Sequence, residues 1–183
     1  TRWVTLSFTD LASYSTILER MSPSVAVDFL NEYFTAMHEV IEEHGGQILN
    51  YIGDAIMVIY GAPQDLKDHE KKAVLCAIKM RERLKILNQK WDKTELSRYW
   101  RNHGIEKISA RTGIHTGNAI TGNLGSERML QYSAIGDVVN VAARLEQCNK
   151  DFGSSIAFSQ EIHTALTRDL YEQATFQGDI QLK

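Results

Sequence analysis

The stretch 47-QILNYIGDAIMVIYGAP-63 predicts a β-hairpin, and the rest of the chain can be arranged around it. Two apolar runs flank Gly53-Asp54, and a two-residue loop that begins with glycine suits a type II′ turn, because glycine accepts a positive φ. This turn would hold the Asp54 carboxylate at the hairpin tip. A second carboxylate, Asp10, ends another apolar run, 1-TRWVTLSFTD-10. For either aspartate alone, the interpretation as an ordinary turn residue is favoured, but two at strand ends can hold hard cations that drive phosphoryl chemistry.

The composition indicates a single globular domain. The chain has 183 residues, of which 43% are hydrophobic and 23% charged, which allows a sizeable core. A net charge of −3 gives no general attraction to nucleic acid or to a membrane surface, so we expect contact with neither. Cys76 and Cys148 form no CxxC pair, which argues against a zinc site or a disulfide scaffold and fits the cytoplasm. No run of apolar residues is long enough to span a membrane, and no signal peptide is visible.

Helical periodicity predicts three main helices. The first begins after Ser22-Pro23, a typical N-cap followed by proline, and ends at Gly45-Gly46. The second covers about 68–91, with Ala73, Ala77 and further apolar residues on its buried face. The third follows Gly136-Asp137, with Asp137 as a plausible N-cap.

Alternating patterns predict the strands, and the region 92–106, which has no clear period, is interpreted as a surface insertion. Ser159 is expected to cap a short helix. Strands separated by helices and hairpins predict an α/β fold, an α+β sandwich with a mixed, mostly antiparallel sheet and a ferredoxin-like core. Besides the hairpin, the predicted strands are 3–9, 107–115, a short one among Gly117, Gly122 and Gly125, 129–135, 154–159 and 176–182.

Asn140 and Arg144 lie four residues apart on the third helix and therefore share one face. An amide and a guanidinium presented together suit a ribose and a charged phosphate, and arginine is well suited to stabilise a phosphoryl transition state. Taken alone, Arg144 is better interpreted as a surface residue paired with Glu146 or a neighbouring residue.

Four segments together resemble the class III nucleotidyl cyclases, the catalytic domains of adenylyl and guanylyl cyclases, and most resemble the bacterial members. These segments occur in the order of the family and span nearly the whole chain: FTD at 8–10, NYIGDAIMVIYGAP at 50–63, RTGIHTG at 111–117 and YSAIGDVVNVAARLE at 132–146.

The resemblance implies roles for particular residues. Asp10 and Asp54 match the two metal-binding aspartates, and Leu11 matches a residue that offers its backbone carbonyl to a metal. Asn140 matches the residue that orients the ribose, and Arg144 the one that stabilises the transition state. The implied substrate-binding positions are Asn50, Ser133, Arg111 and, within the short motif GDIQLK, Lys183.

The resemblance also implies a head-to-tail homodimer with active sites between the protomers and with two Mg²⁺ or Mn²⁺ ions in each site. One protomer would supply Asp10, Asp54 and Arg111. The partner would supply Asn50, Ser133, Asn140, Arg144 and Lys183. We further expect one catalytic domain over 1–183, cut from a longer protein with an upstream sensory or regulatory domain and incomplete at its C-terminal end.

The positions that read the purine depart from the family pattern. Where adenylyl cyclases usually have Lys with Asp or Thr, and guanylyl cyclases usually have Glu at the first position, this chain has Asn50 and Ser133. Both groups can donate and accept, but neither is the acid that would accept from guanine N1–H and N2 together. We therefore expect ATP as the substrate and cyclic AMP as the product. A guanylyl or dual-specificity cyclase, or a silent nucleotide-binding and dimerisation module, are the alternatives.

Overall fold

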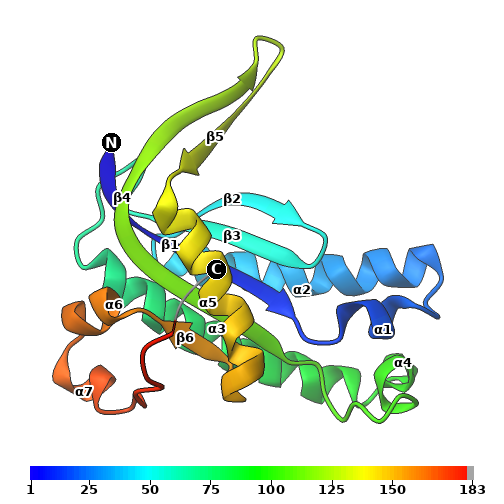
Figure 1. Cartoon of the computed structure of the whole chain (residues 1–183). Coiled ribbons are helices and arrows are strands. Elements are labelled where there is room, and N and C mark those ends of the chain that lie inside the picture. The colour runs from blue at the N-terminus through cyan, green and yellow to red at the C-terminus, as the bar shows by residue number, and fades with distance from the viewer. Residues whose placement is uncertain (181–183) are drawn as a thin grey trace.

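The computed structural model describes residues 1–180, and a six-stranded sheet forms the centre of this part of the chain (Figure 1). The strands run in the order β2-β3-β1-β4-β5, with β6 paired to β4. The β4–β6 pair is parallel and the other pairs are antiparallel. The predicted α+β fold with a mixed, mostly antiparallel sheet is confirmed. The strand bounds are β1 Arg2–Leu11, β2 Gln47–Ile52, β3 Ala55–Tyr60, β4 Ala110–Ser126, β5 Met129–Ile135 and β6 Ile156–Phe158.

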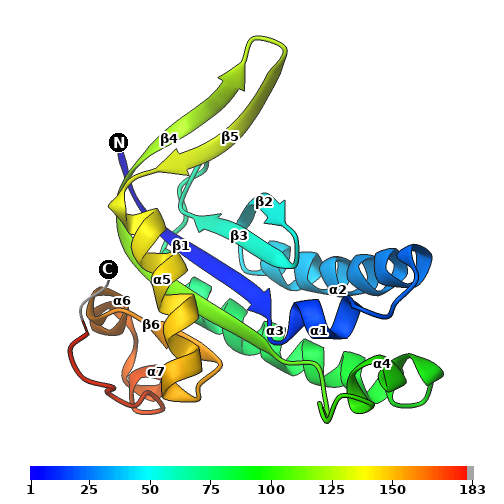
Figure 2. The same ribbon diagram turned by 45° about the vertical axis from the view of Figure 1, so that its right-hand side comes forward.

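Helices cover both faces of the sheet (Figure 2). Two long helices, α2 (Pro23–Glu43) and α3 (His69–Trp91), bury their apolar residues in a core with Leu11, Ile56 and Ile114. A third helix, α5 (Asp137–Phe152), contributes Val138 and Ala142 to a smaller core with Val4 and Leu6. Since side chains alternate along a strand, β1 supplies residues to both cores.

The predicted turn of the hairpin and the predicted start of the first long helix are confirmed. Gly53 has a φ of +61°, as a glycine-first turn requires, and Asp54 is not among the residues with positive φ. The Ser22 hydroxyl accepts a hydrogen bond from the Val25 N–H at 3.3 Å and so caps α2.

The interpretation of residues 92–106 as a surface insertion is wrong. The segment forms a short 3₁₀ turn, Glu95–Ser97, followed by α4, Arg98–Arg101. Trp100 is completely buried, with its ring 5.9 Å from that of Phe29 and 5.8 Å from that of Trp91. Trp100 is therefore a core residue although its segment lacks helical spacing, because its aromatic partners Phe29 and Trp91 lie on α2 and α3.

The glycines of 110–126 do not divide this region into two strands, contrary to the prediction. β4 is continuous because it changes partners along its length: Ala110–Ala119 pair with β1, and Ile120–Ser126 pair with β5. A Cβ at Gly113 would lie 2.1 Å from the Glu146 backbone nitrogen, so this glycine allows α5 to approach β4 closely.

Smaller elements also differ from the sequence predictions. Asp137 is the first residue of α5, and Gly136 is its N-cap. The predicted strand 176–182 is wrong for 176–180, which form no regular element and pair with no strand of the described chain. The helix predicted after Ser159 is confirmed as α6, Gln160–Ala165. Two further short helices were not predicted: α1, Tyr14–Leu18, and α7, Arg168–Tyr171.

The β4–β5 hairpin projects from the body of the molecule as an arm (Figures 1 and 2). Several of its apolar side chains are exposed, including Met129 at 77%, Ile120 at 61% and Leu130 at 59%. Exposed apolar groups gathered on one element are typical of a surface that contacts another molecule. No helix within residues 1–180 is both long and apolar enough to cross a membrane.

Candidate active site

The hairpin tip brings Asp54 against the end of β1. The Leu11 backbone N–H donates a hydrogen bond to Asp54 Oδ2 over 2.7 Å, although 43 residues separate the two. Leu11 follows Asp10 directly, so this bond brings the two predicted metal aspartates to one edge of the sheet. Because Leu11 is bonded through its N–H, its carbonyl takes no part in the contact with Asp54.

Asp10 and Arg111 lie opposite one another in the β1–β4 register. Asp10 Oδ1 is 3.5 Å from Arg111 Nε. Both atoms are buried and neither has a hydrogen-bond partner in the described chain. The pair therefore has an ionic contact but retains unused hydrogen-bonding capacity next to Asp54.

Burial raises the pKa of the Asp54 carboxyl above its usual range, and the nearby Asp10 carboxylate adds to that effect, while the Leu11 N–H opposes it. Burial and then the carboxylates of Asp54 and Asp10 also raise the pKa of Tyr33, a completely buried tyrosine whose hydroxyl has no partner in the described residues. Two carboxylates that repel one another in a partly desolvated place, as the raised pKa of Asp54 indicates, favour a bound cation, which would offset that repulsion.

The donor set fits Mg²⁺ or Mn²⁺. Asp10 and Asp54 supply hard oxygen donors, and the Asp10 Oδ1 atom is buried without a hydrogen bond. No cluster of three or more histidine, cysteine or acidic side chains suitable for a metal occurs in residues 1–180. Mg²⁺ is usually held by one or two carboxylates, with substrate phosphates and water completing its coordination.

Helix α5 presents two faces with different roles. Asn140 and Arg144 are both exposed and lie on one face, as their spacing predicts. Glu146 lies on the opposite face, is only 5% exposed, and has Oε2 without a hydrogen-bond partner in the described part of the chain. Burial and the neighbouring Asp10 carboxyl raise the pKa of Glu146 to about 8. Within one chain, α5 thus turns Glu146, and not Arg144, toward Asp10.

The two predicted purine-reading positions lie on β2 and β5, which are at opposite ends of the strand order but are joined by a side-chain hydrogen bond. The Gln131 side chain on β5 donates to the carbonyl of Leu49 on β2. Asn50 follows Leu49, and Ser133 lies two residues after Gln131. Asn50 is exposed and Ser133 is half-buried. Lys183 lies outside the residues that the structure describes.

Comparisons with known proteins show the family to which the chain belongs. The family model described as the adenylate and guanylate cyclase catalytic domain matches residues 1–183. The chain belongs to this family of cyclase catalytic domains.

Among its relatives, adenylate cyclase 1 of Rhizobium meliloti (strain 1021) is 40% identical over 156 residues, which cover 85% of this chain and 22% of that protein. The adenylate cyclase of Anabaena cylindrica is 34% identical and is matched over 88% of this chain and 30% of that protein. The cyclase domain thus spans less than a third of the length of these curated relatives.

Solved structures show the same fold. The guanylyl cyclase Cya2 superposes with a TM-score of 0.76 at 31% identity, over 90% of this chain and 78% of that one. The adenylyl cyclase CyaB from P. aeruginosa gives a TM-score of 0.73 at 30% identity, over 89% of this chain and 79% of that one. Cyclases named for both purines therefore share this architecture.

Sequence reasoning missed two buried polar residues of the cyclase domain, Glu146 and Tyr33. The pattern suggests Glu146 only as a surface partner for Arg144, although its position two residues away, on the other side of the helix, argues against that pairing. Tyr33 occurred in an apolar stripe and could not be separated from ordinary core residues by pattern alone.

Proposed function

We propose that this cyclase domain is an adenylyl cyclase that converts ATP to 3′,5′-cyclic AMP and pyrophosphate. The observation that carries the proposal is the edge formed by Asp10, Asp54 and Arg111, where two carboxylates meet beside one guanidinium. The family membership and the 40% identity to a protein named adenylate cyclase 1 support it.

Asp10 and Asp54 would hold two divalent ions together with the Leu11 carbonyl, and Arg111 would face the phosphates. When bound, such ions lower the pKa of the attacking ribose 3′-hydroxyl and neutralise charge on the leaving pyrophosphate. The residues of the protein would then position the ribose 3′-hydroxyl and the phosphates for the reaction. No histidine or glutamate general base is required in this proposal.

Asn140 and Arg144 would act on the substrate from the exposed face of α5. The Asn140 amide would orient the ribose for in-line attack on the α-phosphorus. The Arg144 guanidinium would stabilise the charge that develops on the α-phosphate, a contact stronger in the transition state than in the bound substrate. Lys183 would bind the terminal phosphate.

The active sites would form between two copies arranged head to tail. Arg144 and Asp10 belong to different surfaces of one chain, since α5 turns Glu146 toward Asp10 and Arg144 outward. A partner copy could therefore bring Asn50, Ser133, Asn140 and Arg144 to the edge that holds Asp10. The exposed apolar arm of β4 and β5 supports this proposal, because it offers a surface for such a contact.

Asn50 and Ser133 would read the purine. The Asn50 amide can donate to adenine N1, and the Ser133 hydroxyl can accept from the N6 amino group. Guanine would leave donors unpaired in the pocket, at a cost of about 1–3 kcal/mol. We expect ATP to be favoured over GTP by about tenfold to a hundredfold in kcat/KM.

ATP as substrate implies a cytoplasmic location for the domain, and the long relatives are consistent with a regulatory domain elsewhere in the full protein. The deciding experiment measures cyclic AMP and cyclic GMP formed by the purified domain with ATP or GTP, each with Mg²⁺ and with Mn²⁺. A predominance of cyclic AMP supports the proposal. Cyclic GMP in excess, or equal efficiencies, would replace it by the guanylyl or dual-specificity alternative, which the similarity to Cya2 favours.

A silent module would form no cyclic product under any of these conditions, even as a dimer. It would still bind ATP. Nucleotide binding measured by equilibrium dialysis on the same sample separates this outcome from a domain that has lost its fold.

A further inference from the structure

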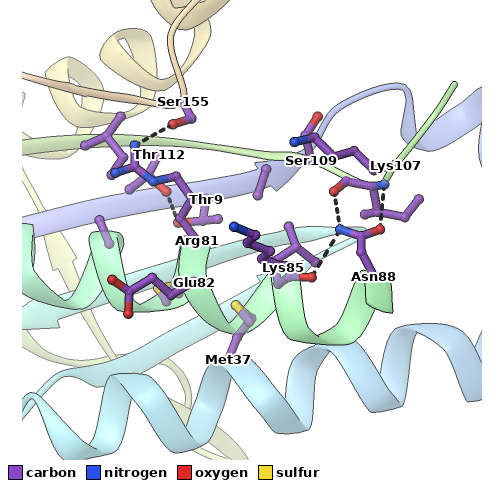
Figure 3. Close-up of a pocket in the computed structure, with 16 residues that line it drawn as sticks. Thr9, Met37, Arg81, Glu82, Lys85, Asn88, Lys107, Ser109, Thr112 and Ser155 are labelled. Carbon is purple, nitrogen blue, oxygen red and sulfur yellow. Dashed lines mark hydrogen bonds between the residues drawn. The ribbon is translucent and has the colours of Figure 1, made fainter. Parts of the chain in front are cut away.

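A cavity of about 480 Å³ lies between α3 and the strands β1 and β4 (Figure 3). Its volume is in the range of sites for small organic molecules. The inner wall is apolar and fully buried, and comes from α2, α3 and the segment before β4. It consists mainly of Met37, Ala77, Met80, Leu84 and Ile108.

The buried polar groups of the cavity already have partners. Thr9 and Thr112 join their hydroxyls at 2.9 Å. The Asn88 amide donates to the carbonyls of Leu84 and Ile108, at 3.1 and 2.8 Å, and accepts from the Ile108 N–H at 2.9 Å. Since these groups need no further partner, the interior offers little to water and favours an apolar occupant.

The rim of the cavity is positively charged. Arg81, Lys85 and Lys107 line it and are exposed, whereas Glu82 is the single acidic residue among the lining residues. Glu82 forms an ion pair with Lys79, with 3.4 Å between Oε2 and Nζ. Arg81 donates only to the neutral Ser155 hydroxyl at 3.1 Å, and Lys85 and Lys107 form no ion pair within residues 1–180. Figure 3 shows Arg81 extending from α3 toward Ser155.

We propose that this cavity is a binding site for a small amphipathic carboxylate. Its apolar body would lie against Met37, Met80 and Ile108, and its carboxylate would be held at the rim by Arg81 and Lys85. The planar guanidinium suits a carboxylate, which it can bind through two parallel hydrogen bonds. The alternative, that α3 simply exposes a solvated basic face, would explain the rim but not the apolar cavity beneath it.

The cavity is distinct from the proposed catalytic residues, although it shares two strands with them. Thr9 and Thr112 are paired across β1 and β4, next to the pair Asp10 and Arg111, and their side chains point to the opposite face of the sheet. Occupancy of the cavity therefore does not require nucleotide, metal or a dimer. The inference stands independently of the proposed cyclase activity.

The test uses decanoate as the probe, followed through the methyl groups of the five methionines by ¹³C-edited NMR. Met37 and Met80 line the cavity, whereas Met129 is 77% exposed on the arm and serves as an internal control. We expect saturable shifts of the Met37 and Met80 methyls without a shift of Met129. Acetate, which lacks an apolar body, should shift none of them, and decanol, which lacks the charge, should bind more weakly.

Variants test the role of the rim charge. Lys85→Glu should raise the Kd for decanoate by about fivefold, since an exposed ion pair contributes modestly. Lys93→Glu makes the same charge change on an exposed lysine outside the cavity and should alter the Kd by less than about twofold. Both substitutions are at exposed positions, so both variants should fold, which the unchanged methyl spectrum without ligand would verify.

Two results would overturn the inference. A shift of the Met129 methyl signal without shifts of the Met37 and Met80 signals would mean that decanoate binds the exposed apolar side chains of the arm nonspecifically, as a detergent does. Equal weakening by Lys85→Glu and Lys93→Glu would mean that only the net charge of the chain matters. Saturable shifts at Met37 and Met80 with selective loss in Lys85→Glu would establish the site.

Discussion

The two groups of predicted active-site residues are held in different ways. Asp10, Asp54 and Arg111 are fixed by contacts inside the chain, through the Leu11 N–H bond and the 3.5 Å ionic contact. Asn140 and Arg144 stand on the exposed face of α5. The first group is organised within the fold of one chain, and the second is presented outward. This difference is what a site shared between two copies requires.

The largest effect is expected from Asp54→Asn. The substitution keeps the size of the side chain and its bond from the Leu11 N–H, but removes the charge that would hold a cation. Cyclase activity should fall by about a thousandfold or more, while dimerisation is unchanged. Initial rates and sedimentation velocity measure the two properties. Asp151→Asn, at an exposed position on α5, is the matched control and should keep full activity.

Arg144→Ala should lower kcat by about a hundredfold and change KM by less than about threefold, because the proposed contact forms mainly in the transition state. Steady-state kinetics with varied ATP separate the two constants. An increase in KM at constant kcat would instead make Arg144 a residue that binds the ground state.

Gly113→Ala should break the contact between α5 and β4. The added Cβ would meet the Glu146 backbone nitrogen at 2.1 Å, and backbone atoms cannot move aside cheaply. The free energy of unfolding should decrease by about 2 kcal/mol, measured by urea denaturation. Gly122→Ala is the control within the same strand, since nothing lies within 4 Å of its Cβ, and it should change stability much less.

Mixing the two inactive variants tests the shared site directly. In a two-fold dimer, Asp54→Asn and Arg144→Ala combined in equal amounts give mixed dimers with one intact site each, so about a quarter of the wild-type activity should return. The activity is measured after subunit exchange. No recovery, in a sample shown to exchange subunits, would mean that both residues belong to the same site of one chain.

The smallest expected effect concerns Glu146. Its pKa of about 8 lies above the ordinary value of 4.5, so its contribution to stability is present below about pH 4.5 and is lost as pH rises through 8. Glu146→Gln stays neutral, and should therefore gain stability relative to the wild type between pH 5 and 9, on the order of 1 kcal/mol. Urea midpoints of the metal-free proteins measure this. An equal difference in stability between Glu146→Gln and the wild type at pH 5 and at pH 9 would contradict the prediction.

The sequence predicted the parts of the fold whose signals are local. Ser22 and Gly53 marked a helix start and a turn because their backbone preferences act within a few residues. The burial of Trp100 could not be predicted, since its partners Phe29 and Trp91 lie on other elements.

The same limit applies to the candidate site. Asp10 and Asp54 were predicted as a pair, but the contact of Glu146 with Asp10 depends on how closely α5 approaches β4. Gly113 permits that approach, but nothing in the sequence distinguishes it from the other glycines of this strand.

The continuity of β4 has a structural consequence. Its seventeen residues, at a rise of about 3.3 Å each, give a contour length of about 55 Å, of which Ala110–Ala119 lie beside β1 and Ile120–Ser126 belong to the arm. Arg111 lies near one end and Ser126 at the other. One continuous strand thus carries both the exposed arm and Arg111, so a molecule bound to the arm would contact the same strand that holds Arg111 opposite Asp10.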